Sequence, residues 1–187
     1  MDIRETGIPG AFVVTPEQLP DERGNFYEAM HSDRFARALG RPFEPRQINY
    51  AVSRRNTLRG LHSVAGPQGQ DTFVTCVRGA LRAFLADLRL GSPAFGLVVG
   101  HELDADSGVS VFVPEGVAHG LLTLTDEACV CYVLSTAHGP GAQVDIDPLD
   151  PVLAIDWGFT EPPLMSAGDS GAMSLREAVA SRVLASW

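Results

Sequence analysis

The sequence lacks an excess of positive charge, and this absence bears on its partners. Its 14 Lys and Arg residues are outnumbered by 23 Asp and Glu residues, which gives a formal net charge of −9. Sequence-independent binding of nucleic acid needs a basic surface. The composition therefore argues against nucleic acid as a partner, although arginines gathered at one place can still bind a small anion.

The sequence also lacks a long hydrophobic run. No apolar stretch approaches the roughly 20 residues that span a bilayer, and the first five residues (MDIRE) lack the charged-then-apolar pattern of a secretion signal. We therefore expect no membrane association and a cytoplasmic location.

Cysteine is scarce as well. Cys76, Cys129 and Cys131 make an odd number without the spacing of a metal-binding knuckle. Cys129 and Cys131 stand two apart in an apparent strand, so they face the same side. We interpret all three as small buried residues of a protein in a reducing compartment.

Short apolar segments separated by turns are abundant. The segments lie at 47–52, 72–77, 81–88, 95–99, 109–113, 121–124 and 129–134, with Gly- and Pro-rich turns such as 65–67, 78–79, 91–93, 114–116 and 139–141 between them. Many short strands at this spacing are typical of an antiparallel sandwich or barrel. The length of 187 residues fits one domain with a sizeable core.

Helices are expected only at the margins of the chain. Ser32 is placed to cap a short helix that runs through residue 38 and stops at Gly40. Ser174 and Glu177 have capping-box spacing and open a helix toward residue 185. We therefore predict one domain over 1–187, all-β with short peripheral helices and a C-terminal helical tail from about residue 174.

Polar residues gather in the stretch 46–79. Gln47 and Asn49 alternate onto one face of a strand, and Arg59, His62 and Gln70 follow. Burying such side chains inside a β-barrel is costly unless they pair or meet a polar ligand. The pattern indicates either a ligand site or a polar sheet face turned to solvent, and the residues alone leave both open.

A second polar feature is the stretch 114–120 (PEGVAHG), a tight turn that delivers His119 onto the next strand. It matches the second half of the cupin pattern, proline-x-glycine-x-x-histidine, whose histidine often binds a metal. The first half, His-x-His followed by a carboxylate, is missing because His62 stands alone. Two isolated histidines are a poor site for a tightly held ion, so we predict no metal.

Two further residues carry weaker signals. Tyr132 stands in an apolar strand, where a tyrosine usually packs in the core with its hydroxyl satisfied. Asp169 ends the turn-like stretch 165–169 (MSAGD), where an aspartate usually stabilises the turn. Taken singly, neither residue indicates a function.

Taken together, the motifs of the chain resemble the dTDP-4-dehydrorhamnose 3,5-epimerase family. They follow one another in the family order and cover most of the chain, which is hard to produce by chance. The motifs are Asp21-x-Arg23-Gly24-x-Phe26-x-Glu28, Gln47-x-Asn49, 58–62 (LRGLH), 91–96 (GSPAFG), 114–120 (PEGVAHG), Asp150-Pro151, Ile155-x-Trp157 and Ser166-x-x-Asp169.

The resemblance implies a cupin-type double-stranded β-helix, a jelly-roll barrel, assembled as a homodimer without metal or organic cofactor. It implies a nucleoside-diphosphate 4-keto-6-deoxyhexose as substrate. The reaction removes a proton beside the C4 ketone, at C3, C5 or both, and returns one from the opposite face. Such chemistry needs a base, an acid across the sugar and a donor to the enolate oxygen.

The resemblance also implies residue roles. By position, His62 resembles the base, Asp169 the carboxylate that orients it and Tyr132 the acid across the sugar. The expected contacts to nucleotide, diphosphate and sugar are Arg23, Phe26, Glu28, Gln47, Asn49, Arg59, Gln70, Thr72, His119 and His138. Forked arginine donors suit a diphosphate, which reconciles an anionic ligand with an acidic chain.

Four positions depart from the family pattern. Thr72 stands where the family usually has a lysine, the natural donor to the enolate, and we expect its side chain to face the cavity. His138 replaces a usual tyrosine, Gln143 a usual glutamate and Val64 a usual polar residue. Two alternatives therefore stay open beside epimerisation: another proton-transfer chemistry on the same scaffold, or a non-catalytic ligand-binding cupin.

Overall fold

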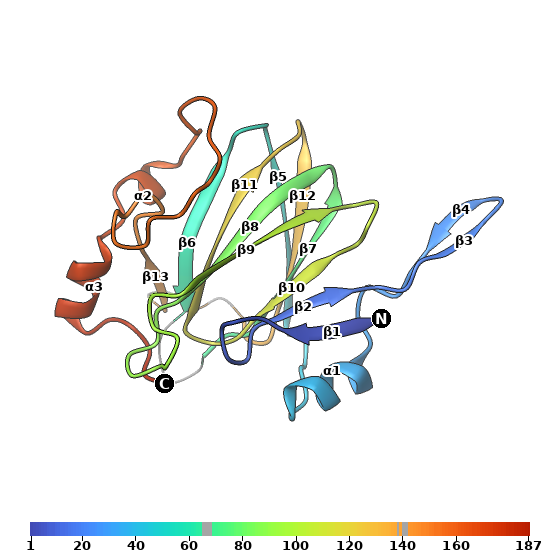
Figure 1. The fold of residues 1–187 in the computed structure, drawn as a ribbon, viewed down its shortest axis with the longest axis horizontal. Helices are drawn as coiled ribbons and strands as arrows, with labels where there is room; N and C mark the ends of the chain where they lie inside the picture. Colours follow the sequence, from blue (N-terminus) through green and yellow to red (C-terminus); the bar gives the residue numbers. More distant parts are fainter. Residues whose placement is uncertain (65–68, 138, 140–141) are drawn as a thin grey trace.

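The computed structural model describes residues 1–64, 69–137, 139 and 142–187. Two antiparallel β-sheets form the body of the molecule (Figure 1). The first sheet has six strands, in the order β1 (Asp2–Glu5), β2 (Phe12–Thr15), β10 (Ser110–Val113), β7 (Thr72–Arg78), β12 (Ala128–Leu134) and β5 (Gln47–Ser53). The second has five, in the order β13 (Gln143–Asp145), β6 (Leu58–Val64), β11 (Val117–Thr123), β8 (Ala80–Asp87) and β9 (Val98–Asp104). This is the predicted all-β, cupin-type jelly-roll barrel.

Alternation along the strands divides the hydrophobic residues into three clusters. Between the sheets, Val74 of β7, Leu85 of β8 and Leu121 of β11 are at most 2% exposed and belong to one cluster. The neighbouring residues point outward: those of the second sheet pack against Trp157 and the C-terminal segment, and those of the first pack against Phe35. Each sheet is therefore partly covered on its outer face, while its inner face lines the barrel.

A third, two-stranded sheet stands apart from the body. It consists of β3 (Leu19–Asp21) and β4 (Gly24–Phe26), and it projects from the barrel as a hairpin (Figure 1). All six of its residues are exposed. The hairpin therefore buries little surface against the body of its own chain.

The predicted strands are present, with changes at their ends. The segment predicted at 95–99 is wrong at its start, because Phe95 and Leu97 close turns onto Ser92 and Ala94 and β9 begins only at residue 98. The strand predicted at 121–124 begins earlier, at residue 117. Strands β1 to β4, β6 and β13 were not among the predicted segments. The turns predicted at 65–67 and 139–141 fall wholly or partly outside the described residues.

The helices differ from prediction at their ends. Helix α1 (Ser32–Leu39) ends at Gly40 with φ 70°, as expected, but its N-cap is His31 and its cap has no side-chain hydrogen bond, so Ser32 is not the cap. Helix α3 (Leu175–Ser181) has the predicted capping box of Ser174 and Glu177. It stops short of residue 185 because the chain after it pairs with the loop that follows β8. The one-turn helix α2 (Ala167–Ser170) was not predicted.

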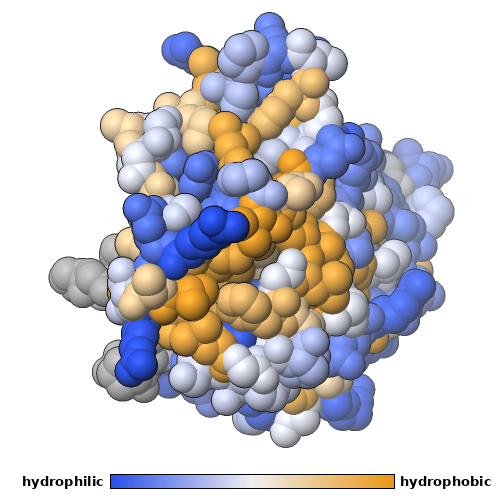
Figure 2. All heavy atoms as spheres, turned by 60° about the vertical axis from the view of Figure 1, so that its left-hand side comes forward, coloured by the Kyte–Doolittle hydropathy of each residue, from blue (hydrophilic) through white to orange (hydrophobic). Residues whose placement is uncertain are grey.

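Hydrophobic side chains also reach the surface. Figure 2 shows them gathered around a hollow, with hydrophilic residues at the rim, on the face that comes forward when the left-hand side of Figure 1 is turned toward the viewer. In the segment 149–179, Leu149, Val152, Leu164 and Val179 are 39–52% exposed. No helix in the described part of the chain is long and apolar enough to cross a membrane.

Candidate active site

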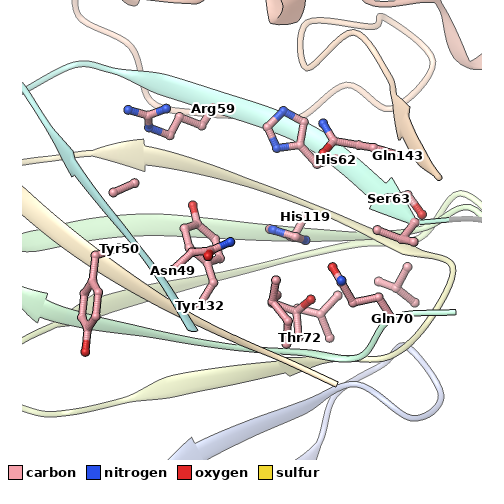
Figure 3. Close-up of a pocket in the computed structure, with 15 residues that line it drawn as sticks. Asn49, Tyr50, Arg59, His62, Ser63, Gln70, Thr72, His119, Tyr132 and Gln143 are labelled. Atoms are coloured by element: carbon pink, nitrogen blue, oxygen red, sulfur yellow. The ribbon is translucent and has the colours of Figure 1, made fainter. Parts of the chain in front are cut away.

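The inner faces of the two sheets enclose an open cavity of about 290 Å³ (Figure 3). Seven of the predicted site residues line this cavity: Asn49, Arg59, His62, Gln70, Thr72, His119 and Tyr132. Asn49, Thr72 and Tyr132 come from the first sheet, and Arg59, His62 and His119 from the second. The polar residues of 46–79 therefore do meet at a cavity, and the alternative of a polar sheet face open to solvent is not needed for these residues.

The position of His62 depends on a close approach of β6 to β11. The two strands pair His62 with His119, and Gly60 lies on β6 against Gly120 of β11. A Cβ atom at residue 60 would stand 2.6 Å from the Gly120 Cα, and Gly60 has φ 120°, which disfavours any side chain. Glycine at residue 60 therefore allows the two histidine-bearing strands to lie together.

His62 is tied to a carboxylate behind the cavity. Its Nε2 lies 2.8 Å from Asp169 Oδ1, which confirms the predicted hydrogen bond. A neutral imidazole has one N–H and one lone pair. When Nε2–H donates to the carboxylate, the lone pair remains on Nδ1, the tautomer that a base requires. Asp169 itself does not line the cavity.

Asp169 is held by two further donors, of which Ser166 was not predicted to have a role. Ser166 Oγ donates to Asp169 Oδ2 at 2.8 Å and accepts from the Asp169 backbone N–H at 3.0 Å, so it is also the N-cap of α2. The backbone N–H of Gly60 reaches Asp169 Oδ1 at 3.3 Å. Burial by itself would raise the pKa of Asp169, but the bonds from Ser166, His62 and Gly60 lower it below its ordinary value. The Ser-x-x-Asp spacing was the available signal, since it is the spacing of a helix cap.

His119 lies between the candidate base and the candidate acid. Its ring centroid is 6.4 Å from that of His62, with the planes at 88°, and 6.0 Å from that of Tyr132. Burial, and to a smaller extent the nearby His62, lower the pKa of His119 to about 3. The imidazole of His119 is therefore neutral near pH 7.

Tyr132 lies on β12, in the sheet that faces His62, and it lines the same cavity (Figure 3). Burial raises the pKa of the Tyr132 phenol, the charge of Arg59 opposes that rise, and the charge of Asp169 adds to it. The net direction is upward, so the phenol keeps its proton at neutral pH. This agrees with the prediction that Tyr132 and His62 face each other across a cavity.

Thr72 faces the cavity as predicted. It is only 4% exposed and lies at the start of β7, on the same side as Val74 and Cys76. Gln70, just before it, donates its amide to the backbone carbonyl of Thr136 at 2.9 Å. This part of the wall is therefore formed by side chains that carry no charge.

The mouth of the cavity near β13 holds a second polar pair. Gln143 lines the cavity and donates its amide to Asp145 Oδ1 at 2.6 Å, and the same Asp145 oxygen lies 3.8 Å from His62 Nε2. Neither residue was predicted to contribute to the site, although Gln143 was noted as a departure from the family pattern. The remaining lining residues that sequence reasoning did not place here are Tyr50, Ala51, Ser63, Val64, Val113, Val117 and Leu134.

Arg59 supplies the cationic group of the cavity. Its Nε donates to Ser53 Oγ at 3.0 Å, which fixes the guanidinium at the cavity wall. Asn49 accepts a hydrogen bond of 2.9 Å from the amide of Gln47 on the same strand. Gln47 is thus next to a lining residue without lining the cavity itself.

Three nominated residues lie away from this cavity. Arg23 and Phe26 are on the projecting hairpin and Glu28 follows it; all three are exposed, Phe26 by 64%. Arg23 pairs with Asp21 of the same hairpin. The position of His138 falls outside the described residues. The described part of the chain has no group of three or more His, Cys, Asp or Glu side chains placed to hold a metal ion.

The sequence is similar to those of known proteins over most of its length. The family profile for dTDP-4-dehydrorhamnose 3,5-epimerase matches residues 5–177. A dTDP-4-dehydrorhamnose 3-epimerase of Streptomyces niveus is 46% identical over 178 residues, covering 95% of this chain and 86% of the relative. A dTDP-4-dehydrorhamnose 3,5-epimerase of Mycobacterium tuberculosis is 37% identical and covers 100% of this chain and 94% of the relative.

A solved structure is similar over the whole fold. It is the crystal structure of a 4-keto-6-deoxy sugar epimerase from the novobiocin biosynthetic gene cluster of Streptomyces spheroides. The TM-score is 0.97 at 44% sequence identity, with 100% of this chain and 94% of that chain covered. The similarity therefore extends over the barrel, the hairpin and the C-terminal segment.

Proposed function

The chain belongs to the dTDP-4-dehydrorhamnose 3,5-epimerase family, and we propose that it is a sugar-nucleotide epimerase that inverts C3, C5 or both of a dTDP-4-keto-6-deoxyhexose. The observation that carries the proposal is the pairing of His62 with Asp169 on one side of a cavity and Tyr132 on the other. A base and an acid on opposite sides of a bound sugar are what inversion of a carbon needs.

In the first half-reaction, Nδ1 of His62 removes a proton from the carbon beside the C4 ketone. The electron pair of the broken C–H bond forms a carbon–carbon double bond, and the ketone oxygen becomes the enolate oxygen. Asp169 keeps the Nε2–H of His62 in place and compensates the positive charge of the imidazolium. Its lowered pKa keeps it a carboxylate at neutral pH.

In the second half-reaction, Tyr132 donates its phenolic proton to the same carbon from the other face. The enolate electrons form the new C–H bond and the ketone is restored. Tyr132 then regains a proton from solvent, and His62 releases to solvent the proton that it took. The raised pKa of the phenol, which follows from burial, suits this role because the acid must still hold its proton when the enolate forms.

The binding roles extend the same proposal. The free nitrogens of the Arg59 guanidinium suit the diphosphate, while Asn49, Gln70, Thr72 and His119 line the space for the sugar. Gln47 supports Asn49 through its amide.

A homodimer is the assembly that we propose for this function. Strand β5 is the edge of the first sheet, and Ile48 and Val52 on its outward side are 55% and 56% exposed. Edge strands are commonly covered by a partner. A second copy would cover this apolar row, and its projecting hairpin would bring Arg23 and Phe26 near a neighbouring cavity. Sedimentation should give a dimer, and Val52→Lys should shift it toward monomer; a monomeric wild type would contradict the proposal.

We further propose that residues 1–187 act as one domain in the cytoplasm. The three cysteines are free thiols, and disulfides are rare in reducing compartments. Helix α3 joins the core around Trp157, which supports a single folding unit.

Deuterium uptake tests the proposed reaction. The wild-type chain incubated with dTDP-4-keto-6-deoxyglucose in heavy water should introduce deuterium at C3, C5 or both, as followed by NMR. Uptake at one position marks an enzyme that inverts one centre. An absence of uptake at both positions would reject the function.

A further inference from the structure

The proposed reaction develops negative charge on the C4 oxygen, and a donor must meet it. Removing one preorganised donor to such an oxygen costs roughly 10²–10³ in rate. The chain contains no lysine, since all 14 of its cationic side chains are arginine. The donor must therefore be an arginine, a neutral side chain or a water molecule.

Several hydrogen-bond donors of the cavity already have protein partners. Gln70 and Gln143 direct their amides to other protein groups. Arg59 uses its Nε on Ser53, and the proposed function places its other nitrogens on the diphosphate. Among the described cavity residues outside the proposed base and acid, four side-chain donors have no protein partner: the Asn49 amide nitrogen, the Ser63 and Thr72 hydroxyls and the His119 ring.

Position distinguishes His119 from the other unpaired donors as the candidate partner of the enolate oxygen. The enolate oxygen is bonded to a carbon next to the reacting carbon, so it lies between the faces approached by the base and by the acid. His119 is the residue whose ring stands within 6.4 Å of the His62 ring and 6.0 Å of the Tyr132 ring, measured between centroids. Figure 3 shows the His119 ring near the labelled side chains of His62 and Tyr132 at the cavity.

We propose that the ring N–H of His119 donates the hydrogen bond that stabilises the enolate oxygen, a role that rests on the epimerase function proposed above. The proton stays on His119 throughout, so no further atom is transferred. The enolate oxygen accepts the bond as it gains charge and releases it when the ketone re-forms.

The neutral state of His119 fits this role. Its pKa is lowered to about 3 by burial and by His62, so no second positive charge opposes the imidazolium that forms on His62. A neutral imidazole still has one N–H, and a neutral imidazole N–H can polarise a carbonyl. The arrangement meets the enolate charge in a chain without an ammonium group.

The test uses two variants of His119 on the full chain. His119→Phe keeps a planar ring and removes the donor, whereas His119→Gln keeps an N–H. The rate of deuterium uptake into dTDP-4-keto-6-deoxyglucose should fall about 10²–10³-fold in His119→Phe and recover at least about tenfold from that level in His119→Gln. The affinity for dTDP, measured by calorimetry, should change less than about threefold, because the donor acts on the sugar oxygen.

His101 offers a matched control. It is a half-buried histidine of β9, its Nε2 has no partner, burial lowers its pKa, and it does not line the cavity. His101→Phe should leave the uptake rate within about twofold of wild type. Thr72→Val removes the competing hydroxyl at similar volume and should cost less than His119→Phe.

Four outcomes would overturn the assignment. They are an uptake rate for His119→Phe within threefold of wild type, an equal loss in His119→Gln, a larger loss in Thr72→Val, or a loss of dTDP affinity that accounts for the whole effect. A wild-type chain without any uptake is a distinct result, because it rejects the epimerase function and the role of His119 with it.

Discussion

The two walls of the cavity are built in different ways. The His62 wall is held by directed bonds, with Asp169, Ser166 and the Gly60 N–H forming a network behind the base. In the described part of the chain, the Tyr132 wall has no such network, and burial raises the pKa of the Tyr132 phenol. A base needs a fixed tautomer and an acid needs to keep its proton, so each wall has the construction that its proton transfer requires.

The largest expected effect comes from removing the proposed base, His62. His62→Ala should lower both deuterium uptake and inversion by roughly 10²–10⁴, because a positioned general base contributes about that factor. NMR of the substrate in heavy water measures both quantities. His101→Ala, outside the cavity, is the control for loss of a half-buried histidine. Uptake in His62→Ala near the wild-type rate would mean that the bonded wall is not the base side.

A smaller effect on turnover is expected from a substitution in the Tyr132 wall. Thr72→Lys would place an ammonium on β7 next to the cavity, and a charged donor is roughly twice as strong as a neutral one. We expect slow turnover of the wild type on dTDP-4-keto-6-deoxyglucose and a gain of about tenfold or more in the variant. Steady-state kinetics measure the change. If the wild type is already fast and the variant is slower, the neutral donors suffice and the added charge disturbs them.

The smallest expected effect tests the network itself. Ser166→Ala removes a bond to Asp169 and the cap of α2, so we expect a rate loss of a few-fold and a stability loss of about 1 kcal/mol. The lowered pKa of Asp169 contributes stability above its unfolded value near 4, and this contribution is lost as pH falls through the folded value. Part of the stability difference between wild type and variant should therefore disappear below about pH 4 in urea titrations. Ser166→Thr should restore most of it, and a difference independent of pH would assign Ser166 to capping alone.

The sequence predicted the barrel and the cavity better than it predicted strand β6, the projecting hairpin and the C-terminal segment. Alternating apolar segments predicted four of the six strands of the first sheet, but β6 was not among the predicted strands because Arg59, Gly60 and His62 interrupt its apolar pattern. Strand β6 is also the strand that carries His62, the proposed base. The pairing of β6 with β11 explains why polar residues occupy this strand, and local sequence does not encode that contact.

Tertiary packing explains the other differences. The motif around Arg23 and Phe26 was predicted to contact the ligand, yet the hairpin that bears it projects from its own barrel, which no local pattern indicates. The helical pattern of 175–185 favours a longer helix than α3. The C-terminal residues instead pair with Leu90, and the ring of Trp187 packs 4.3 Å from the guanidinium of Arg89. At the C-terminus, long-range contacts overrode local helix propensity.

The most direct test of the account is the ratio of deuterium uptake to inversion in Tyr132→Phe. If the base and the acid occupy opposite walls, His62 in this variant still removes the substrate proton and returns a solvent deuteron to the same face. We therefore predict that inversion falls by at least about 10² while uptake at the same carbon falls far less, so that recovered substrate carries deuterium with its configuration retained. Equal losses of uptake and inversion, or inversion at the wild-type rate, would contradict the assignment of the two walls to base and acid.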